Sequence, residues 1–279
     1  MSLAAELAGL RELDTTARVL TFDIETQRAI IETFSLFSKY TPMQRVLVPA
    51  RILCLSARWR GEDKDIFHAA WDEDDKHNVD PVQYEKMLRA IWKLLDAADI
   101  VVTYNGDRFD LQWVEAECAR LGMGRPAPYK SVDLFKIVKR RFKAGLMSCK
   151  LEWSARYWLH DGKVPHGGSD LWHDIRHGTR AQQRAAQKIM TDYCKHDVIL
   201  TERLLDEHLP WTNLNIALYR SDPDDEVLRC TKCGKSGLRA LKKKVYTAAY
   251  AYQAYKCPHC GSVSRGKRSK LTTELRSVT

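Results

Sequence analysis

Residues 21–26 read Thr-Phe-Asp-Ile-Glu-Thr, so that two acids alternate with two large apolar residues. Alternate side chains of a β-strand point to opposite faces of a sheet. This order therefore places Phe22 and Ile24 in a core, and Asp23 and Glu25 together on the other face. Two neighbouring carboxylates repel each other unless a cation lies between them. Taken alone, the pair also fits an ordinary solvated strand face. A metal site is indicated only if other ligand residues of the chain reach the same face.

The apolar pattern along the chain predicts an α/β domain. Strands are expected at residues 18–24, 51–59, 65–70 and 100–104. Helices are expected at residues 80–98, 109–121, 132–142, 149–159 and 182–205. Residues 160–179 are rich in Gly and His and are expected to form a loop. This order of elements predicts a mixed central sheet flanked by helices.

Two further acids are placed to reach the same face of the sheet. Asp110 follows a buried strand, at the start of a predicted helix. Ligands collect at strand ends in α/β sheets, although acids also favour helix N-termini through the helix dipole. Asp197 lies four residues after Tyr193 on a predicted helix, so the two share one face, and a buried aspartate needs a cation or hydrogen-bond donors. Asp107 is a rival metal ligand, but its neighbours favour a turn.

Three segments, Phe22–Thr26, Tyr104–Asp110 and Tyr193–Asp197, resemble the exonuclease motifs of the DEDD superfamily in its tyrosine subclass. The nearest likeness is to the 3′→5′ proofreading domain of family B DNA polymerases. It covers residues 18–205, and residues 148–152 also resemble a segment of that domain. The order of elements resembles the RNase H-like α/β fold. No polymerase palm or fingers would fit in the rest of the chain, so we expect a stand-alone nuclease.

The resemblance implies a two-metal site for Mg²⁺ or Mn²⁺, hard cations that prefer oxygen ligands. Its ligands would be Asp23, Glu25, Asp110 and Asp197. Two such ions activate a water and stabilise the leaving 3′ oxygen, and the products would be nucleoside 5′-monophosphates. Tyr193 would orient the water, because a phenol with a pKa of about 10 is a poor general base. Contacts with the nucleic acid are expected from Thr26, from the side-chain amide of Asn105 and from the ring of Phe109.

The last fifth of the chain carries a second metal signal, two C-x-x-C pairs formed by Cys230, Cys233, Cys257 and Cys260. Four thiolates at this spacing complete a tetrahedral Zn²⁺ site, and a hairpin through residues 245–246 and 250–255 would bridge the gap. Without a secretory signal, metal binding is favoured over disulfide bonding. His259 is a weaker candidate ligand. The sequence predicts a small zinc ribbon with too little core to fold without its metal.

Charge is concentrated in the same region. Thirteen Lys and Arg residues follow position 226 against one acid, which leaves 32 basic and 35 acidic residues before it. Such asymmetry suggests a polyanionic partner. On charge alone a solubilising basic tail fits equally well, and it is the paired cysteines that favour the partner. Lys242, Lys243 and Lys244 stand beside four tyrosines, a composition that suits phosphate contact and base stacking. The tyrosines are equally suited to building the sheet of the ribbon itself. A ribbon that binds a protein instead of nucleic acid is an alternative that the sequence leaves open.

We therefore expect an RNase H-like nuclease domain at residues 1–221 and a basic zinc-ribbon domain at residues 222–279. No apolar segment approaches the length of a membrane span, and residues 1–20 do not resemble a secretory signal. We accordingly expect an intracellular, cytoplasmic protein with no membrane partner.

The leading hypothesis is a 3′→5′ exonuclease acting on single-stranded DNA or 3′ ends, an activity that serves DNA replication and repair. A separate polymerase or replication protein is a candidate partner. One alternative is a nuclease of the same fold that acts on RNA or on branched structures, because sugar discrimination rests on contacts that the motifs do not specify. Another alternative is a catalytically silent adaptor that binds nucleic acid. The complete set of acids argues against this alternative.

Overall fold

The computed structural model describes residues 17–71, 81–219 and 224–272, except positions 36, 38, 166, 248 and 249. Contacts within the chain divide it into a core unit, residues 18–204, and a tail unit that holds the residues from 205 onward. The predicted boundary between residues 221 and 222 lies outside the described residues and stays a prediction.

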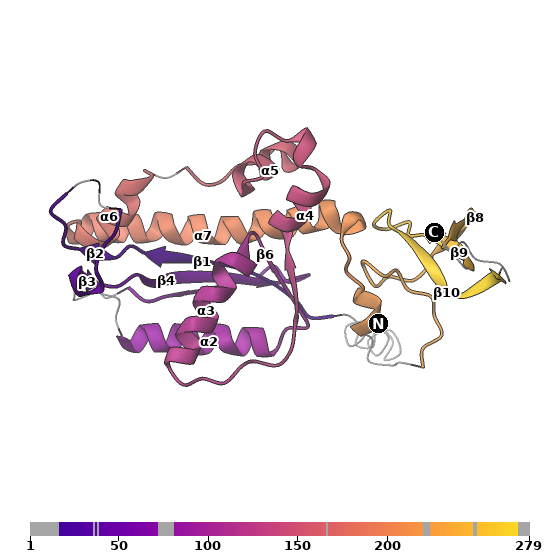
Figure 1. Cartoon of the computed structure of the whole chain (residues 1–279), viewed down its shortest axis with the longest axis horizontal. Helices are drawn as coiled ribbons and strands as arrows, with labels where there is room; N and C mark the ends of the chain where they lie inside the picture. Colours follow the sequence, from indigo (N-terminus) through magenta and orange to yellow (C-terminus); the bar gives the residue numbers. More distant parts are fainter. Residues whose placement is uncertain are drawn as a thin grey trace, which may run out of the picture. The chain divides into compact units, whose positions relative to one another are not determined.

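The core unit is built on a five-stranded sheet in the order β5-β4-β1-β6-β7 (Figure 1). Its strands are β1 (Val19–Gln27), β4 (Arg51–Trp59), β5 (Asp65–Ala69), β6 (Ile100–Thr103) and β7 (Lys130–Asp133). Strand β4 pairs antiparallel with β1 and β5, whereas β1, β6 and β7 are parallel. This topology confirms the predicted RNase H-like α/β fold.

Helices cover both faces of the sheet, as Figure 1 shows. On one side lie α2 (Pro81–Asp96) and α3 (Asp110–Arg120), whose apolar residues pack with Phe22 and Ile24 in the main core. On the other side α6 (Ser169–His177) and α7 (Arg180–His208) pack on β4 through a second cluster around Met190 and Cys194. Strand β1 thus buries its apolar residues against α2 and α3, and its two acids face the α7 side, as the alternation predicts.

Two predicted elements need correction. Residues 130–133 form strand β7, and α4 (Leu134–Arg141) begins only after Asp133, whose carboxylate caps it by accepting from the N–H of Phe135 at 3.0 Å. A run of four residues is too short for its period to be read from the sequence. The predicted loop at 160–179 contains α6, in which Leu171, Trp172 and Ile175 follow helical spacing and pack into the second cluster. Helix α5 (Leu151–Leu159) agrees with expectation.

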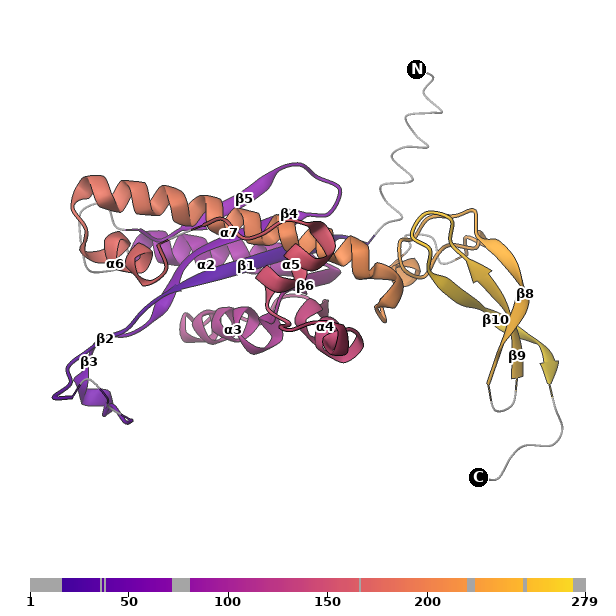
Figure 2. The same ribbon diagram turned by 90° about the horizontal axis from the view of Figure 1, so that it is seen from above.

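A short hairpin, which was not predicted, extends from the end of β1. Strands β2 (Ile30–Ile31) and β3 (Val46–Val48) pair antiparallel, and the chain between them includes a single 3₁₀ turn at residues 43–45. We call residues 30–48 the arm. Figure 2 shows β2 and β3 projecting beyond the sheet, in line with β1 and β4.

The tail unit contains a three-stranded antiparallel sheet in the order β10-β9-β8. The strands are β8 (Arg239–Tyr246), β9 (Tyr250–Lys256) and β10 (Val263–Thr272). The hairpin of β8 and β9 confirms the predicted one, and β10 is an additional strand. None of the helices in the described ranges has the length and apolar character needed to span a membrane.

Candidate active site

Three of the predicted acids meet between β1 and α7. Each of Asp23, Glu25 and Asp197 offers a carboxylate oxygen, and these oxygens all lie within 4.8 Å of one another. Asp23 and Glu25 are partly exposed, whereas Asp197 is buried at 1% exposure. Close packing of the two elements brings them together, since the Cys194 sulfur on α7 lies 3.8 Å from the Asp23 carbonyl oxygen. Sequence positions 23, 25 and 197 thus form one site.

The fourth acid, Asp110, is held differently. It is buried at 3% exposure, and its Oδ1 accepts a hydrogen bond of 2.9 Å from the backbone N–H of Ile24. The carboxylate of Asp110 is thereby tied to β1 and lies outside the three-acid cluster. The rival acid, Asp107, pairs with Lys136 at 2.5 Å and also accepts from Ser131, so it is engaged elsewhere.

The acids strongly disfavour one another's ionisation. Burial, followed by the charges of Asp110, Asp197 and Glu25, raises the pKa of Asp23 well above its ordinary value. Burial and the charge of Asp197 raise the pKa of Glu25 to about 8. Burial also raises the pKa of Asp110 to about 7, against the opposing hydrogen bond from Ile24. A bound cation would relieve this repulsion, since an opposite charge favours the ionised form.

Lys163 enters the site from the loop that precedes α6, and it was not anticipated from the sequence. Its Nζ donates to Asp197 Oδ2 at 2.5 Å and to the Tyr193 hydroxyl at 2.7 Å. Burial lowers the pKa of Lys163, but the neighbouring Asp197 and Tyr193 outweigh it and leave the pKa raised. An ammonium group therefore already compensates part of the negative charge of the acids. A loop without periodicity gave no signal for this contact.

The loop that carries Lys163 is fixed by several polar contacts. The Lys163 N–H donates to Glu152 Oε2 at 2.6 Å, and His196 Nε2 lies 2.9 Å from the Gly162 carbonyl oxygen. Asp161 Oδ2 accepts from Arg203 at 2.5 Å. Glu152 is on α5, whereas His196 and Arg203 are on α7. These contacts position the Lys163 side chain from both neighbouring helices.

Tyr193 is buried at 7% exposure on the same helix face as Asp197. Burial and the charge of Asp197 raise the pKa of its phenol, despite the opposing effect of Lys163. The phenol thus stays protonated near neutral pH, which suits a hydrogen-bonding role better than proton abstraction.

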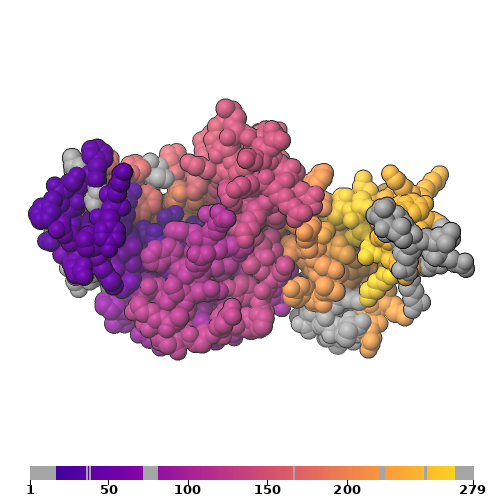
Figure 3. Space-filling view, in the orientation of Figure 1, coloured from indigo at the N-terminus to yellow at the C-terminus, as the bar shows by residue number. Residues whose placement is uncertain are grey.

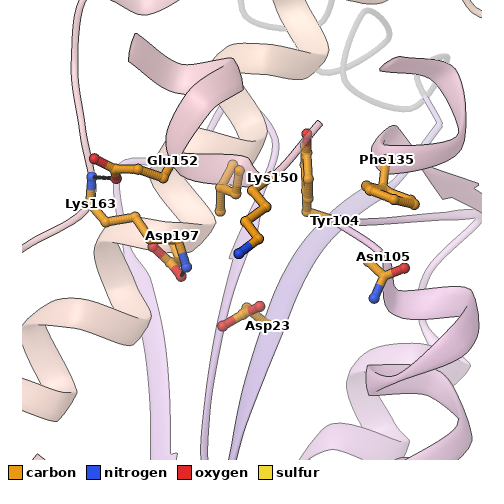
Figure 4. Close-up of a pocket in the computed structure, with 9 residues that line it drawn as sticks. Asp23, Tyr104, Asn105, Phe135, Lys150, Glu152, Lys163 and Asp197 are labelled. Atoms are coloured by element: carbon orange, nitrogen blue, oxygen red, sulfur yellow. Dashed lines mark hydrogen bonds and ion pairs between the residues drawn. The ribbon is translucent and has the colours of Figure 1, made fainter. Parts of the chain in front are cut away.

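A cavity of about 420 Å³ opens beside the acids (Figure 4). Its lining residues are Asp23, Tyr104, Asn105, Phe135, Lys150, Leu151, Glu152, Lys163 and Asp197. Figure 4 shows the ammonium of Lys150 pointing toward Asp23 and that of Lys163 lying beside Asp197. The cavity therefore combines carboxylates, two cations and aromatic surface, a combination that suits a phosphodiester carrying a base and a sugar.

The three expected nucleic-acid contacts of the core unit are placed differently. Asn105 lines the cavity, and its left-handed backbone (φ 69°) is fixed by a 2.8 Å bond from its N–H to Asp133. Thr26 and Phe109 are not among the lining residues. The Thr26 carbonyl oxygen accepts from Trp172 at 3.1 Å, and the Phe109 ring packs edge-on against Trp113.

The donor set of the acid cluster fits a hard divalent cation. All its ligands are carboxylate oxygens, as Mg²⁺ and Mn²⁺ prefer. Among the residues that the structure describes, the buried Oδ1 of Asp197 has no hydrogen-bond partner. Buried carboxylate oxygens are normally satisfied, so an oxygen in this condition is suited to coordinate a metal ion.

The four cysteines of the tail unit also meet at one point. Their sulfurs all lie within 4.8 Å of one another, with 3.6 Å between Cys230 and Cys260 and 3.7 Å between Cys233 and Cys257. Tetrahedral Zn²⁺ with Zn–S bonds of about 2.3 Å requires sulfurs about 3.8 Å apart, so the cluster fits this ion. Burial raises the pKa of Cys230, but hydrogen bonds from Ser262 and nearby backbone N–H groups outweigh it and lower the pKa to about 7.

Both cysteine pairs adopt the same turn. Gly234 (φ +74°) donates to the Cys230 carbonyl at 3.0 Å, and Gly261 (φ +72°) donates to the Cys257 carbonyl at 3.0 Å. Glycine accepts this left-handed conformation without strain. His259 is exposed and lies outside the sulfur cluster.

Lysines 242–244 lie on β8, beyond the cysteine turns. Lys242 and Lys243 are exposed and Lys244 is partly exposed. Tyr246 is exposed at 70%, and the Arg265 guanidinium lies 4.1 Å from the ring centre of Tyr252 on β9. This sheet therefore presents cations and aromatic rings together.

Comparison with known proteins places the core unit in a family. A family model described as the RNase H superfamily matches residues 60–209. Among solved structures, the family B DNA polymerase from the hyperthermophilic archaeon Pyrobaculum calidifontis is similar over 70% of this chain, with 20% sequence identity and a TM-score of 0.50. The chain spans 25% of the length of that polymerase, and the likeness concerns the fold. No curated protein matches the chain in sequence.

Proposed function

The chain belongs to the RNase H superfamily, and on that basis we propose that it is a metal-dependent 3′→5′ exonuclease of the DEDD tyrosine subclass. It would remove nucleoside 5′-monophosphates from DNA ends. The observation that carries the proposal is the convergence of Asp23, Glu25 and Asp197 within 4.8 Å, at the edge of a cavity large enough for a nucleotide. Three carboxylates this close together destabilise the fold unless cations lie between them. The cluster is therefore better explained by metal binding than by a structural role.

Metal ions would be held by Asp23, Glu25 and Asp197, with Asp110 supporting them from its place against β1. Mg²⁺ or Mn²⁺ bound there would activate water and stabilise the negative charge that develops on the leaving 3′ oxygen. The carboxylates would lose their protons as the ions bind, because coordination requires the ionised form.

The remaining groups would position the substrate. Tyr193 would donate a hydrogen bond through its phenol, and Lys150 and Lys163 would bind phosphate oxygens at the mouth of the cavity. The rings of Tyr104 and Phe135, whose centres are 6.1 Å apart, would form the wall against which the terminal nucleoside rests. The Tyr104 hydroxyl is itself held by Ser154 at 2.7 Å and by the Cys149 carbonyl oxygen at 2.5 Å, which orients its ring.

The tail unit would hold the strand beyond the cleavage site. One structural Zn²⁺ bound by the four cysteines would fix β8, β9 and β10, since a sheet of this size has little core of its own. Lys242, Lys243 and Lys244 would contact phosphates, and the exposed tyrosines would stack on bases.

The test uses single-stranded DNA labelled at either end, with Mg²⁺ or Mn²⁺, and compares wild type with Asp23→Ala. We expect labelled mononucleotide to appear first from a 3′ label, and no release from circular DNA. RNA of the same sequence in parallel assigns the sugar preference. Absence of nucleotide release, or release that Asp23→Ala leaves unchanged, would refute the proposal. Cleavage of circular DNA would replace it with an endonuclease.

A further inference from the structure

The arm exposes an unusual set of large apolar side chains. Phe34 and Phe37 are exposed at 94% and 92%, Met43 at 86% and Tyr40 at 79%. Folded proteins scatter single apolar residues over their surfaces, but four such residues within ten positions of one hairpin mark a contact surface. Figure 3 shows the arm, in indigo, as a lobe at the edge of the core unit.

The arm is a direct continuation of the strand that carries the acids. Ile30 follows Glu25 by five residues, or about 17 Å at the rise of a β-strand. Helix α6 fixes the segment that leads into the arm, because Trp172 and Arg176 donate to the backbone carbonyls of Thr26 and Arg28 at 3.1 and 2.7 Å. The arm is therefore anchored where it leaves the candidate active site and exposed at its tip.

Its chemistry matches single-stranded nucleic acid. The exposed apolar residues recur every third position, at 34, 37, 40 and 43, and three of the four are aromatic. Basic residues lie between and beside them: the Arg45 guanidinium is 4.3 Å from the ring centre of Phe34, and Lys39 stands between Phe37 and Tyr40 in sequence. The sequence of the arm contains these two basic residues and one acidic residue, Glu32. Rings that stack on bases, alternating with cations for phosphates, are the elements of single-strand binding sites.

A protein-docking surface would be built differently. Stable protein interfaces surround a closely packed apolar centre with a polar rim. The arm is a narrow hairpin that has its rings spread along it and has cations among them. The positive charge is complementary to a phosphate backbone.

We infer that the arm binds the single-stranded part of the substrate, stacking its bases on Phe34 and Phe37 outside the cavity. The inference rests on the proposed function for the choice of substrate. The arm would bind the strand near the active site, whereas the cavity would accept the terminal nucleotide.

The test compares two double variants of the full chain, Phe34→Ala/Phe37→Ala and Phe34→Leu/Phe37→Leu. Leucine keeps the apolar area and removes the flat ring, so it separates base stacking from general hydrophobic contact. Val82→Ala, which truncates an exposed apolar residue on α2, is the matched control. The readouts are the Kd for a single-stranded oligonucleotide, measured by fluorescence anisotropy without divalent metal, and the hydrolysis rates of that oligonucleotide and of a dinucleotide.

We expect both double variants to bind the oligonucleotide about tenfold or more weakly, because each variant removes two base stacks. The rate on the dinucleotide, which the cavity alone contacts, should be unchanged, and the control should behave as wild type. Oligonucleotide binding equal to wild type in the alanine variant would overturn the inference. So would a leucine variant that binds normally, or a changed oligomeric state with normal binding, since either would make the arm a protein contact.

The two proposals fail in separable ways. If wild type hydrolyses neither substrate, the proposed function fails, and the anisotropy measurement still decides whether the arm binds the strand. If wild type hydrolyses both and the arm variants match it in binding and rate, only the inference about the arm fails.

Discussion

The ammonium of Lys163 lies 2.5 Å from Oδ2 of Asp197, so a side-chain cation is in direct contact with one of the three clustered carboxylates. The contact joins a loop residue to a buried residue of α7, 34 positions apart. In the absence of metal, this lysine is the main compensation for the charge of the acids.

Lys163→Met should therefore destabilise the metal-free protein, because it leaves Asp197 buried without its partner. We expect a loss of about 2–3 kcal/mol in the free energy of unfolding. Urea unfolding in the presence of a chelator measures it. Addition of Mn²⁺ should recover much of the loss. The control is Lys188→Met, which removes an exposed lysine from α7, the helix that carries Asp197. Equal stability of the two variants would contradict the compensating role.

Glu25 gives a prediction about pH. Its pKa is about 8 in the folded protein and about 4.3 in an unfolded chain. Between these values the unfolded state has lost the proton that the folded state keeps, so the stability of the metal-free protein falls as pH rises.

The glutamine in Glu25→Gln cannot ionise, so this variant should lose the part of the pH dependence of stability that comes from Glu25. The variant should be more stable than wild type by about 4–5 kcal/mol near pH 8, with little difference near pH 4. Thermal unfolding with a chelator over this pH range tests it. A difference that is constant across the range would show that the carboxyl does not titrate as described.

Tyr193 should affect the rate and leave metal binding intact. Tyr193→Phe removes the hydroxyl that lies 2.7 Å from Lys163 and keeps the ring in its buried place. Misplacing a reacting group commonly costs about a hundredfold, so we expect kcat to fall by about 10- to 100-fold. Calorimetric titration with Mn²⁺ should give the wild-type affinity. Tyr157→Phe, on an exposed tyrosine of α5, is the control. A variant with normal kcat would remove Tyr193 from the mechanism.

The tail unit should depend on zinc separately from the core unit. Cys230→Ser should lose the bound zinc and the tyrosine near-ultraviolet signal of β8 and β9, because the small sheet has little apolar core of its own. Hydrolysis of a dinucleotide should continue, whereas binding of a longer strand should weaken. Cys149→Ser, outside the sulfur cluster, is the control. A zinc-free variant that keeps the tail signal would contradict a structural role for the metal.

Several of these features followed from the sequence because each depends on a short-range pattern. Alternation at residues 22–25 fixed which side of β1 carries the acids, and the i, i+4 spacing put Tyr193 and Asp197 on one helix face. The two C-x-x-C pairs predicted the sulfur cluster for the same reason. Such patterns depend on local geometry alone.

Other features depend on tertiary contacts that local patterns do not encode. Lys163 contacts Asp197 from a loop whose sequence has no periodicity. Asp110, at the start of α3, accepts a hydrogen bond from the backbone N–H of Ile24 on β1, a contact between two elements far apart in the sequence. Strand β7 is too short to show a period. The exposure of Phe34 and Phe37 contradicts what an apolar segment normally predicts, and only the structure shows that these rings are not in the core.

The most direct measurement is the rate of mononucleotide release from a 3′-labelled single strand as Mn²⁺ is titrated, for wild type and Asp23→Asn. Asparagine keeps the size of the side chain and removes its charge. We expect a rate that rises to a plateau with Mn²⁺ in wild type and stays near background in the variant at every concentration. Release that needs no divalent metal, or that Asp23→Asn preserves, would contradict a metal-dependent nuclease site between β1 and α7.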